Sequence, residues 1–176
     1  MIAAIQLQLA RLANPEDGLF LQKYFKTAPG QYGAGDLFRG VRVPALRKLA
    51  CTHQGIPLQS AGELLRSPYH EDRLLALLIL VLQYAGAQEP GREAIYRMYL
   101  GSTRYINNWD LVDCSAEHLV GAHLRERSRE PLDRLARSES LWERRIAVLA
   151  TFHYIQRGSF GTALKIAGGL LATGKT

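Results

Sequence analysis

Residues 64–80, LLRSPYHEDRLLALLIL, combine a short helix breaker with the start of a long apolar run. Within it, residues 74–82, LLALLILVL, are apolar on every side, so a helix here has to be covered by other helices. A similar pattern returns at residues 135–151, LARSESLWERRIAVLAT, if one residue is inserted in the turn. The chain therefore repeats a unit, and the unit is helical.

The two similar segments align Arg73 with Arg145, and half the distance between them falls on Trp109. Each of these three residues is expected in the second helix of a helix pair, which gives a repeat of roughly 36 residues. Helix pairs at this period are typical of α-solenoids, and the lack of a tetratricopeptide signature favours HEAT-like repeats. The sequence predicts an all-α protein, an α-solenoid of HEAT-like helical repeats, with the three residues in a row on one face.

Helical periodicity runs through nearly the whole chain, and no segment alternates convincingly like a strand. Helices are expected at residues 2–13, 15–26, 43–54, 59–66, 68–86, 89–100, 108–126, 129–138, 140–157 and 159–172. Pro68, Pro90 and Pro131 are each expected at the first position of a helix. The Gly-rich segment 27–41, TAPGQYGAGDLFRGV, is expected to form a long loop.

Length and composition predict one soluble domain. A chain of 176 residues with 47% hydrophobic residues can bury a continuous core, and residues 1–176 are expected to form a single domain. The sequence contains neither a basic leader nor an apolar run long enough for a membrane span, which indicates a cytoplasmic protein. Neither the two cysteines nor the five histidines have metal-ligand spacing, so no metal site is expected.

The pattern GLLATGKT, residues 169–176, resembles a phosphate-binding loop. Such a loop follows a strand and precedes a helix, whereas this segment follows an expected helix and ends the chain. It is not interpreted as a nucleotide site.

The net charge of +6 suggests an acidic partner, although a solvated basic surface would give the same number. Most of the basic residues are arginines, which suit bidentate contacts with phosphate. The excess of positive charge is pronounced in residues 1–50. The basic residues there are Arg11, Lys23, Lys26, Arg39, Arg42, Arg47 and Lys48, against Glu16, Asp17 and Asp36.

In the stretch INNWDLVD, residues 106–113, two amide side chains, Asn107 and Asn108, are followed by the indole of Trp109 and the carboxylates of Asp110 and Asp113. Asp113 follows Trp109 by four residues, so both side chains project from one stripe of a helix, beside Arg145 of the next repeat. One interpretation is a site in which the carboxylate acts on a cationic centre, the indole stacks or presses on a planar group or a sugar, and Arg145 holds a phosphate. The other is ordinary packing by Trp109, an Asp113–Arg145 salt bridge and a helix cap at Asn107 or Asn108.

Four segments in order, FRGVRVPALRKLA, SPYHEDRLLALLILV, INNWDLVD and LWERRIAVLATFHYI, resemble the HEAT-like repeat alkylpurine DNA glycosylases of the AlkD type. The similarity covers roughly Leu19 to Leu171. It implies a solenoid that holds double-stranded DNA and excises cationic 7-methylguanine and 3-methyladenine, the first step of base excision repair. It also implies action without a metal, an organic cofactor or a deep base pocket.

Matching the motifs residue by residue, the resemblance assigns catalysis to Asp113, Trp109 and Arg145, and a DNA contact to the aromatic ring of Tyr24. Further DNA contacts are expected from Arg73, Arg42, Arg47 and Lys48. Two departures from the family pattern stand out. PGQYGAGD enlarges the loop after Tyr24, and the chain ends where the family continues with another helix pair, so this form is expected to lack the last repeats. A HEAT-like scaffold that binds nucleic acid or protein without catalysis is the alternative.

Overall fold

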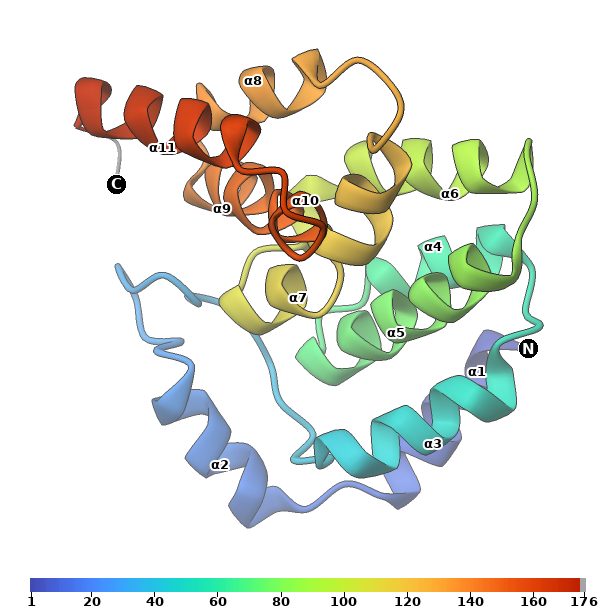
Figure 1. Cartoon of the computed structure of the whole chain (residues 1–176). Helices are drawn as coiled ribbons and strands as arrows, with labels where there is room; N and C mark the ends of the chain where they lie inside the picture. Colours follow the sequence, from blue (N-terminus) through green and yellow to red (C-terminus); the bar gives the residue numbers. More distant parts are fainter. Residues whose placement is uncertain (175–176) are drawn as a thin grey trace. The chain divides into compact units, whose positions relative to one another are not determined.

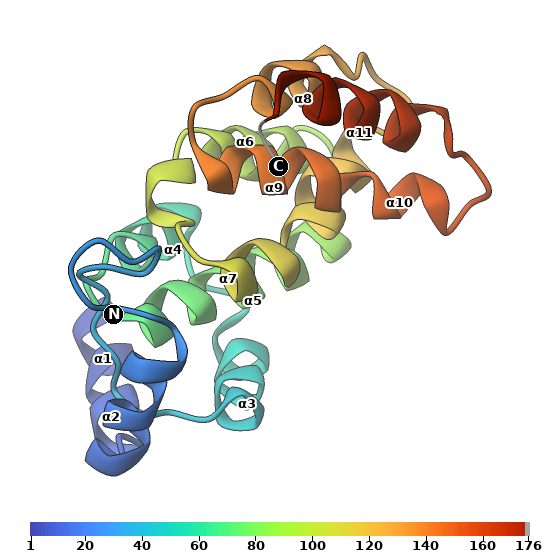
Figure 2. The same cartoon turned by 90° about the vertical axis from the view of Figure 1, so that its left-hand side faces the viewer.

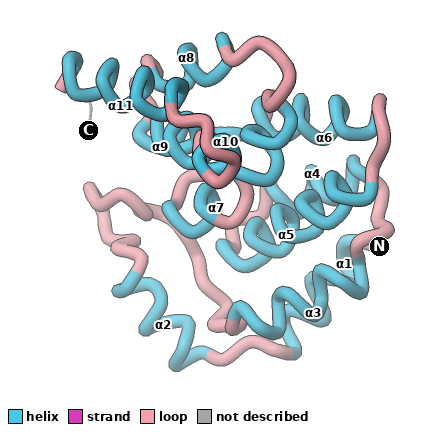
Figure 3. The backbone as a smooth tube through the Cα atoms, in the orientation of Figure 1, coloured by secondary structure: helices cyan, strands magenta, loops and turns pink. Residues whose placement is uncertain are grey.

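The computed structural model describes residues 1–174, and the chain divides into two compact units, Met1–Gly86 and Ala87–Thr176. Both units are helical. Across residues 1–174 no strand forms, and the only β-type pairing is an isolated bridge in the first unit (Figure 3). The all-α prediction is confirmed.

The first unit contains five helices joined by turns and one long loop (Figure 1). They are α1 (Ile2–Arg11), α2 (Pro15–Tyr24), α3 (Val43–His53), α4 (Leu58–Leu65) and α5 (His70–Gly86). Helices α3 and α4 both pack on α5. As expected from its apolar run, α5 is covered, and Leu75, Leu77 and Leu80 have no exposed surface.

Helix α5 begins at His70, two residues later than the sequence predicts. Residues 68–69 pair with the long loop instead. The Leu37 N–H donates to the Pro68 carbonyl at 3.2 Å, and the His70 N–H donates to the Leu37 carbonyl at 2.8 Å. A contact distant in sequence therefore displaces the helix start that proline alone would give.

Over residues 87–174, the second unit contains two helix pairs and a terminal helix. Its elements are α6 (Gly91–Leu100), the 3-10 turn η1 (Thr103–Tyr105), α7 (Trp109–Asp113), the π-helical segment η2 (Glu117–Gly121), α8 (Glu130–Ala136), α9 (Leu141–Ala150), α10 (Phe152–Ile155) and α11 (Gly161–Thr173). Helix α8 packs on α9, and α11 packs on both (Figure 2). Pro131 is the second residue of α8, one position later than predicted, and Pro90 directly precedes α6.

The predicted helix 108–126 is interrupted at residues 114–115, and its next turns are π-helical. The Ser115 hydroxyl donates to the Leu111 carbonyl at 2.5 Å, and it also lies 3.0 Å from the buried Tyr99 hydroxyl. A serine that bonds back to the preceding turn bends a helix. Predicted helix 140–157 is likewise divided at Thr151, whose hydroxyl donates to the Val148 carbonyl at 2.6 Å.

The second helices of consecutive pairs in this unit run in the same direction. Early in each segment, Asp113 of α7 contacts Arg145 of α9. Further along, the backbone of Gly121 lies against Ala150 and His153, so close that a Cβ on Gly121 would be 2.2 Å from the Ala150 carbonyl oxygen. This parallel arrangement brings side chains about 32 residues apart into contact.

Candidate nucleic-acid interface

The site begins at a buried helix cap. Asn108 has no exposed surface, and its Oδ1 accepts the Trp109 N–H at 2.9 Å. An Asn at this position satisfies a backbone donor that the first turn leaves free, so the cap fixes where α7 begins. Trp109 and Asp113 consequently lie about 40° apart around the same helix.

Asp113 and Arg145 form a two-pronged ion pair. Nε of Arg145 lies 2.7 Å from Oδ1 of Asp113, and Nη2 lies 2.7 Å from Oδ2. The Asp113 side chain is 33% exposed and the Arg145 side chain 37%, so the pair is at the surface. The hydrogen bonds and charge of Asp113 raise the pKa of the Arg145 guanidinium above its ordinary value. The guanidinium orients the carboxylate, and both side chains remain partly exposed to solvent.

The contact in this site joins Asp113 to Arg145, and the expected row of Arg73, Trp109 and Arg145 stays a prediction. Asp113 and Arg145 meet, and Trp109 lies half-buried one turn before Asp113 on α7. The Asp113–Arg145 salt bridge and the cap at Asn108 are both contacts that the ordinary-packing interpretation of this stretch expected.

Arg73 belongs to the first unit and lies in its interior. Its side chain is 6% exposed, and its Nη2 is 2.8 Å from Oδ1 of Asp36. The same carboxylate lies 3.4 Å from Nδ1 of the buried His70. This placement does not fit the expected contact between Arg73 and DNA, because the guanidinium neutralises a buried acid.

The other DNA contacts expected in the first unit are exposed. Tyr24 is 55% exposed at the end of α2, and its ring stacks on Phe20 at 6.1 Å, a neighbour that the sequence did not single out. Arg42, at the start of α3, is exposed and pairs with Asp17 at 3.0 Å. Arg47 and Lys48 are exposed on α3.

Two acids at the start of α5 hold the long loop. Asp72 accepts two hydrogen bonds from Arg39, at 2.7 and 3.1 Å. Glu71 accepts the backbone N–H groups of Arg39, Gly40 and Val41 at 2.9, 2.8 and 3.2 Å. The sequence analysis missed both acids because carboxylates in the first turn of a helix are common on ordinary surfaces.

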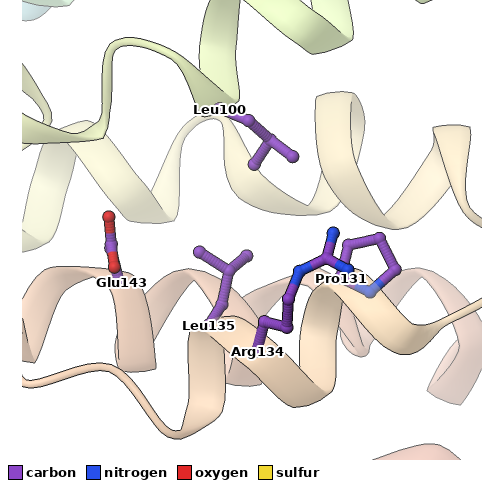
Figure 4. A pocket seen from close by; sticks show the side chains of 5 residues that line it. All are labelled: Leu100, Pro131, Arg134, Leu135 and Glu143. Atoms are coloured by element: carbon purple, nitrogen blue, oxygen red, sulfur yellow. The ribbon is translucent and has the colours of Figure 1, made fainter.

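A hollow of about 210 Å³ lies elsewhere in the second unit (Figure 4). Leu100 of α6, Pro131, Arg134 and Leu135 of α8, and Glu143 of α9 line it. The polar groups there have partners, since Glu143 accepts from Thr103 at 2.7 Å and Arg134 pairs with Glu130 at 2.7 Å. Because Trp109, Asp113 and Arg145 are not among its lining residues, the hollow is separate from the candidate site.

Two general features concern residues 1–174. No group of three or more His, Cys, Asp or Glu side chains there could hold a metal ion. None of the helices in this range is long and apolar enough to cross a membrane. Lys175 and Thr176, which complete the GxxxxGK[ST] pattern, lie outside the described residues.

These observations define an all-α protein built from helix pairs, with a carboxylate–guanidinium pair and an indole on consecutive second helices. The sequence model of the DNA alkylation repair enzymes matches residues 5–175, nearly the whole chain, and the chain belongs to that family. Membership assigns it a role in the repair of alkylated DNA. A search of curated proteins finds no match.

Proposed function

We propose that the protein hydrolyses the N-glycosidic bond of cationic alkylpurines, such as 7-methylguanine and 3-methyladenine, in duplex DNA. One observation carries the proposal: the surface carboxylate of Asp113 is held by two hydrogen bonds from Arg145, on the helix that also presents Trp109.

Cleavage of this glycosidic bond depends on a fixed negative charge rather than on a proton donor. An alkylated purine already carries a positive charge, and the electrons of the breaking C1′–N bond neutralise it, so the leaving base needs no added proton. Positive charge develops on the deoxyribose instead. A carboxylate aimed at that sugar stabilises the transition state, as in glycoside hydrolysis. Asp113 also orients the water that adds to C1′, and the proton of that water leaves to solvent.

Arg145 acts on Asp113 and on DNA. Its Nε and one Nη2 hydrogen are used by Asp113, while a guanidinium has five N–H donors. The remaining donors can bind a phosphate beside the lesion without releasing the carboxylate. Trp109 presses on the sugar, so the base need not enter a deep pocket.

In the first unit, we assign DNA contacts to the exposed residues Tyr24, Arg42, Arg47 and Lys48. Arginine and lysine bind backbone phosphates, and an exposed aromatic ring stacks on a sugar or base. Arg73 is left out of this set because it is buried against Asp36.

The test is the release of 7-methylguanine from alkylated duplex DNA by the wild type, Asp113→Asn and Asp110→Asn. Asp110 is the matched control because it lies on the same helix and its carboxylate accepts the Leu111 N–H. We expect Asp113→Asn to slow release by about 10² or more, since removing one aligned electrostatic group typically costs that much. Asp110→Asn should stay within a few-fold of the wild type.

Equal release by the wild type and Asp113→Asn would remove Asp113 from the mechanism. The binding of duplex DNA by each variant, measured alongside, separates lost catalysis from lost affinity.

A non-catalytic DNA-binding scaffold is the second candidate. The observation that favours it is the mutual satisfaction of Asp113 and Arg145, which a purely structural salt bridge would also have. A scaffold would bind duplex DNA and release no alkylpurine even as the wild type.

A further inference from the structure

A second group of charged side chains lies further along the same two segments that carry Asp113 and Arg145. A Cβ on Gly121 would be 2.8 Å from the Cβ of His153, so the two backbones touch at this point. This close approach places His153 of α10 beside η2, which carries His118. π-helical segments of this kind occur frequently at functional sites.

The next turn of each segment adds an arginine. Arg125 follows Gly121 by four residues and Arg157 follows His153 by four, so the parallel register that joins Gly121 to His153 also aligns these two. Arg157 donates to the His153 carbonyl at 2.6 Å, which fixes it at the end of α10. Both arginines and His118 are exposed.

The charges that act on His153 are all positive. Burial, followed by Arg157, Arg125 and His118, lowers the pKa of His153 to about 4. The carboxylate of Glu126 lies 3.8 Å from Arg125, but its side chain is 83% exposed and screened by water. Helix α11 also packs against α10, and its charged residue, Lys165, pairs with Asp133. The charged groups that act on His153 are therefore positive, although Glu117 of η2 and Glu126 lie next to His118 and Arg125 in the sequence.

We propose that His118, Arg125, His153 and Arg157 form a phosphate-binding cluster that holds a backbone phosphate of nucleic acid beyond the Asp113–Arg145 pair. At ~1.5 Å per residue, Gly121 and Arg125 lie about 12 and 18 Å along the segment from Asp113. At ~3.4 Å per nucleotide, this is about four to five nucleotides along one strand. The inference rests on the proposed DNA binding but not on glycosylase activity.

Positive charges gathered in one place repel one another in the free protein, and a bound anion relieves that repulsion. A phosphate placed among the four side chains supplies the missing negative charge and favours the protonated form of His153. Binding then takes up a proton, so the pKa of His153 rises in the complex and affinity increases as pH falls toward that value.

The first experiment compares the binding of undamaged duplex DNA by the wild type, the double variant Arg125→Gln/Arg157→Gln, and Arg134→Gln/Arg137→Gln. The control pair removes the same charge from two exposed arginines at the end of helix α8. We expect the cluster variant to bind about tenfold more weakly and its log-log salt slope to become shallower by roughly 0.9 per lost contact. The control should change both quantities far less.

The second experiment follows the His153 ring signals by NMR in the full chain, assigned with His153→Gln. The pKa of His153 should move upward when duplex DNA is bound. Inorganic phosphate alone is the second probe, and a rise with phosphate but not with DNA would mean that the cluster takes a free anion, which contradicts the proposal.

The outcomes separate the two proposals. Suppose that the wild type binds duplex DNA, that the cluster variant binds as its control does, and that the pKa of His153 stays constant. The proposed phosphate-binding cluster is then wrong, and the proposed DNA binding stands. If the wild type fails to bind duplex DNA, both fail. If binding behaves as expected but no alkylpurine is released, the cluster stands and the glycosylase proposal fails.

Discussion

At the scale of single residues, Glu71 shows how much one carboxylate can organise. It is 2% exposed and accepts three consecutive backbone N–H groups of the loop that joins α2 to α3. Gly40, in the middle of the three, has a φ of +78°, and a Cβ there would lie 2.0 Å from the Asn14 carbonyl oxygen. The loop is therefore held closely at this point, and α2 with Tyr24 is held with it.

Glu71→Gln should destabilise the first unit by about 2–4 kcal/mol. The new amide keeps one oxygen acceptor but turns an NH2 donor toward the backbone N–H group that the other oxygen accepted, and it removes the negative charge that all three N–H groups face. Urea unfolding followed by circular dichroism measures the change. Glu63→Gln, at an exposed site of α4, is the matched control and should alter stability by less than about 0.5 kcal/mol. Similar midpoints for the two variants would contradict the role of Glu71.

At the scale of elements, the parallel packing of η2 against α9 and α10 depends on one missing side chain. Gly121 has no positive φ, so its requirement for glycine is steric: a Cβ would overlap the Ala150 carbonyl oxygen at 2.2 Å and its carbon at 3.1 Å. Backbone atoms cannot rotate away as a flexible side chain does. The whole segment has to shift to admit even a methyl group.

Gly121→Ala should lower the free energy of unfolding by about 1–3 kcal/mol, the range for overpacking a closed interior. Gly168→Ala is the opposite case, since nothing lies within 4 Å of its Cβ position on α11. There the same substitution should stabilise by about 0.5–1 kcal/mol, because alanine restricts the unfolded chain. Thermal unfolding of both variants measures the two changes. If both substitutions raised the melting temperature, or both lowered it, the steric argument would be contradicted.

At the scale of the whole molecule, the net charge of +6 favours attraction to a polyanion. The chain belongs to a DNA repair family, so DNA is the relevant polyanion. Several positive groups are already neutralised, as Arg39, Arg73 and Arg145 pair with acids. Exposed cations remain in both units, including Arg47 and Lys48 in the first and Arg125 and Arg157 in the second.

The affinity of the full chain for duplex DNA should fall steeply as salt increases, with a log-log slope of about −0.9 for each phosphate neutralised. The slope is measured by fluorescence anisotropy on undamaged and alkylated duplexes. Because phosphate contacts are independent of base chemistry, the two slopes should agree even if the affinities differ. An affinity that does not respond to salt would favour a protein partner over DNA.

The sequence by itself determined the helices, the repeated pairs and the pairing of Trp109, Asp113 and Arg145 as candidates. Helical periodicity and turn residues are local signals, so the expected helices at 15–26, 43–54 and 89–100 differ from α2, α3 and α6 by two residues or fewer at each end. The motif around Trp109 also carried the family resemblance, which the family match confirms.

Only the tertiary structure decided which side chains meet. The sequence repeat aligned Arg73 with Arg145. Arg73 is buried against Asp36 and Arg145 is partly exposed and paired with Asp113, because different neighbours set the burial and the partner of each. The same holds for the interruption at Ser115 and for the cluster around His153, which depend on the Tyr99 hydroxyl and on the close approach at Gly121. Contacts between residues far apart in sequence depend on how closely the helices pack, and a shift of a few tenths of an ångström changes which side chains fit together. No local sequence pattern contains that information.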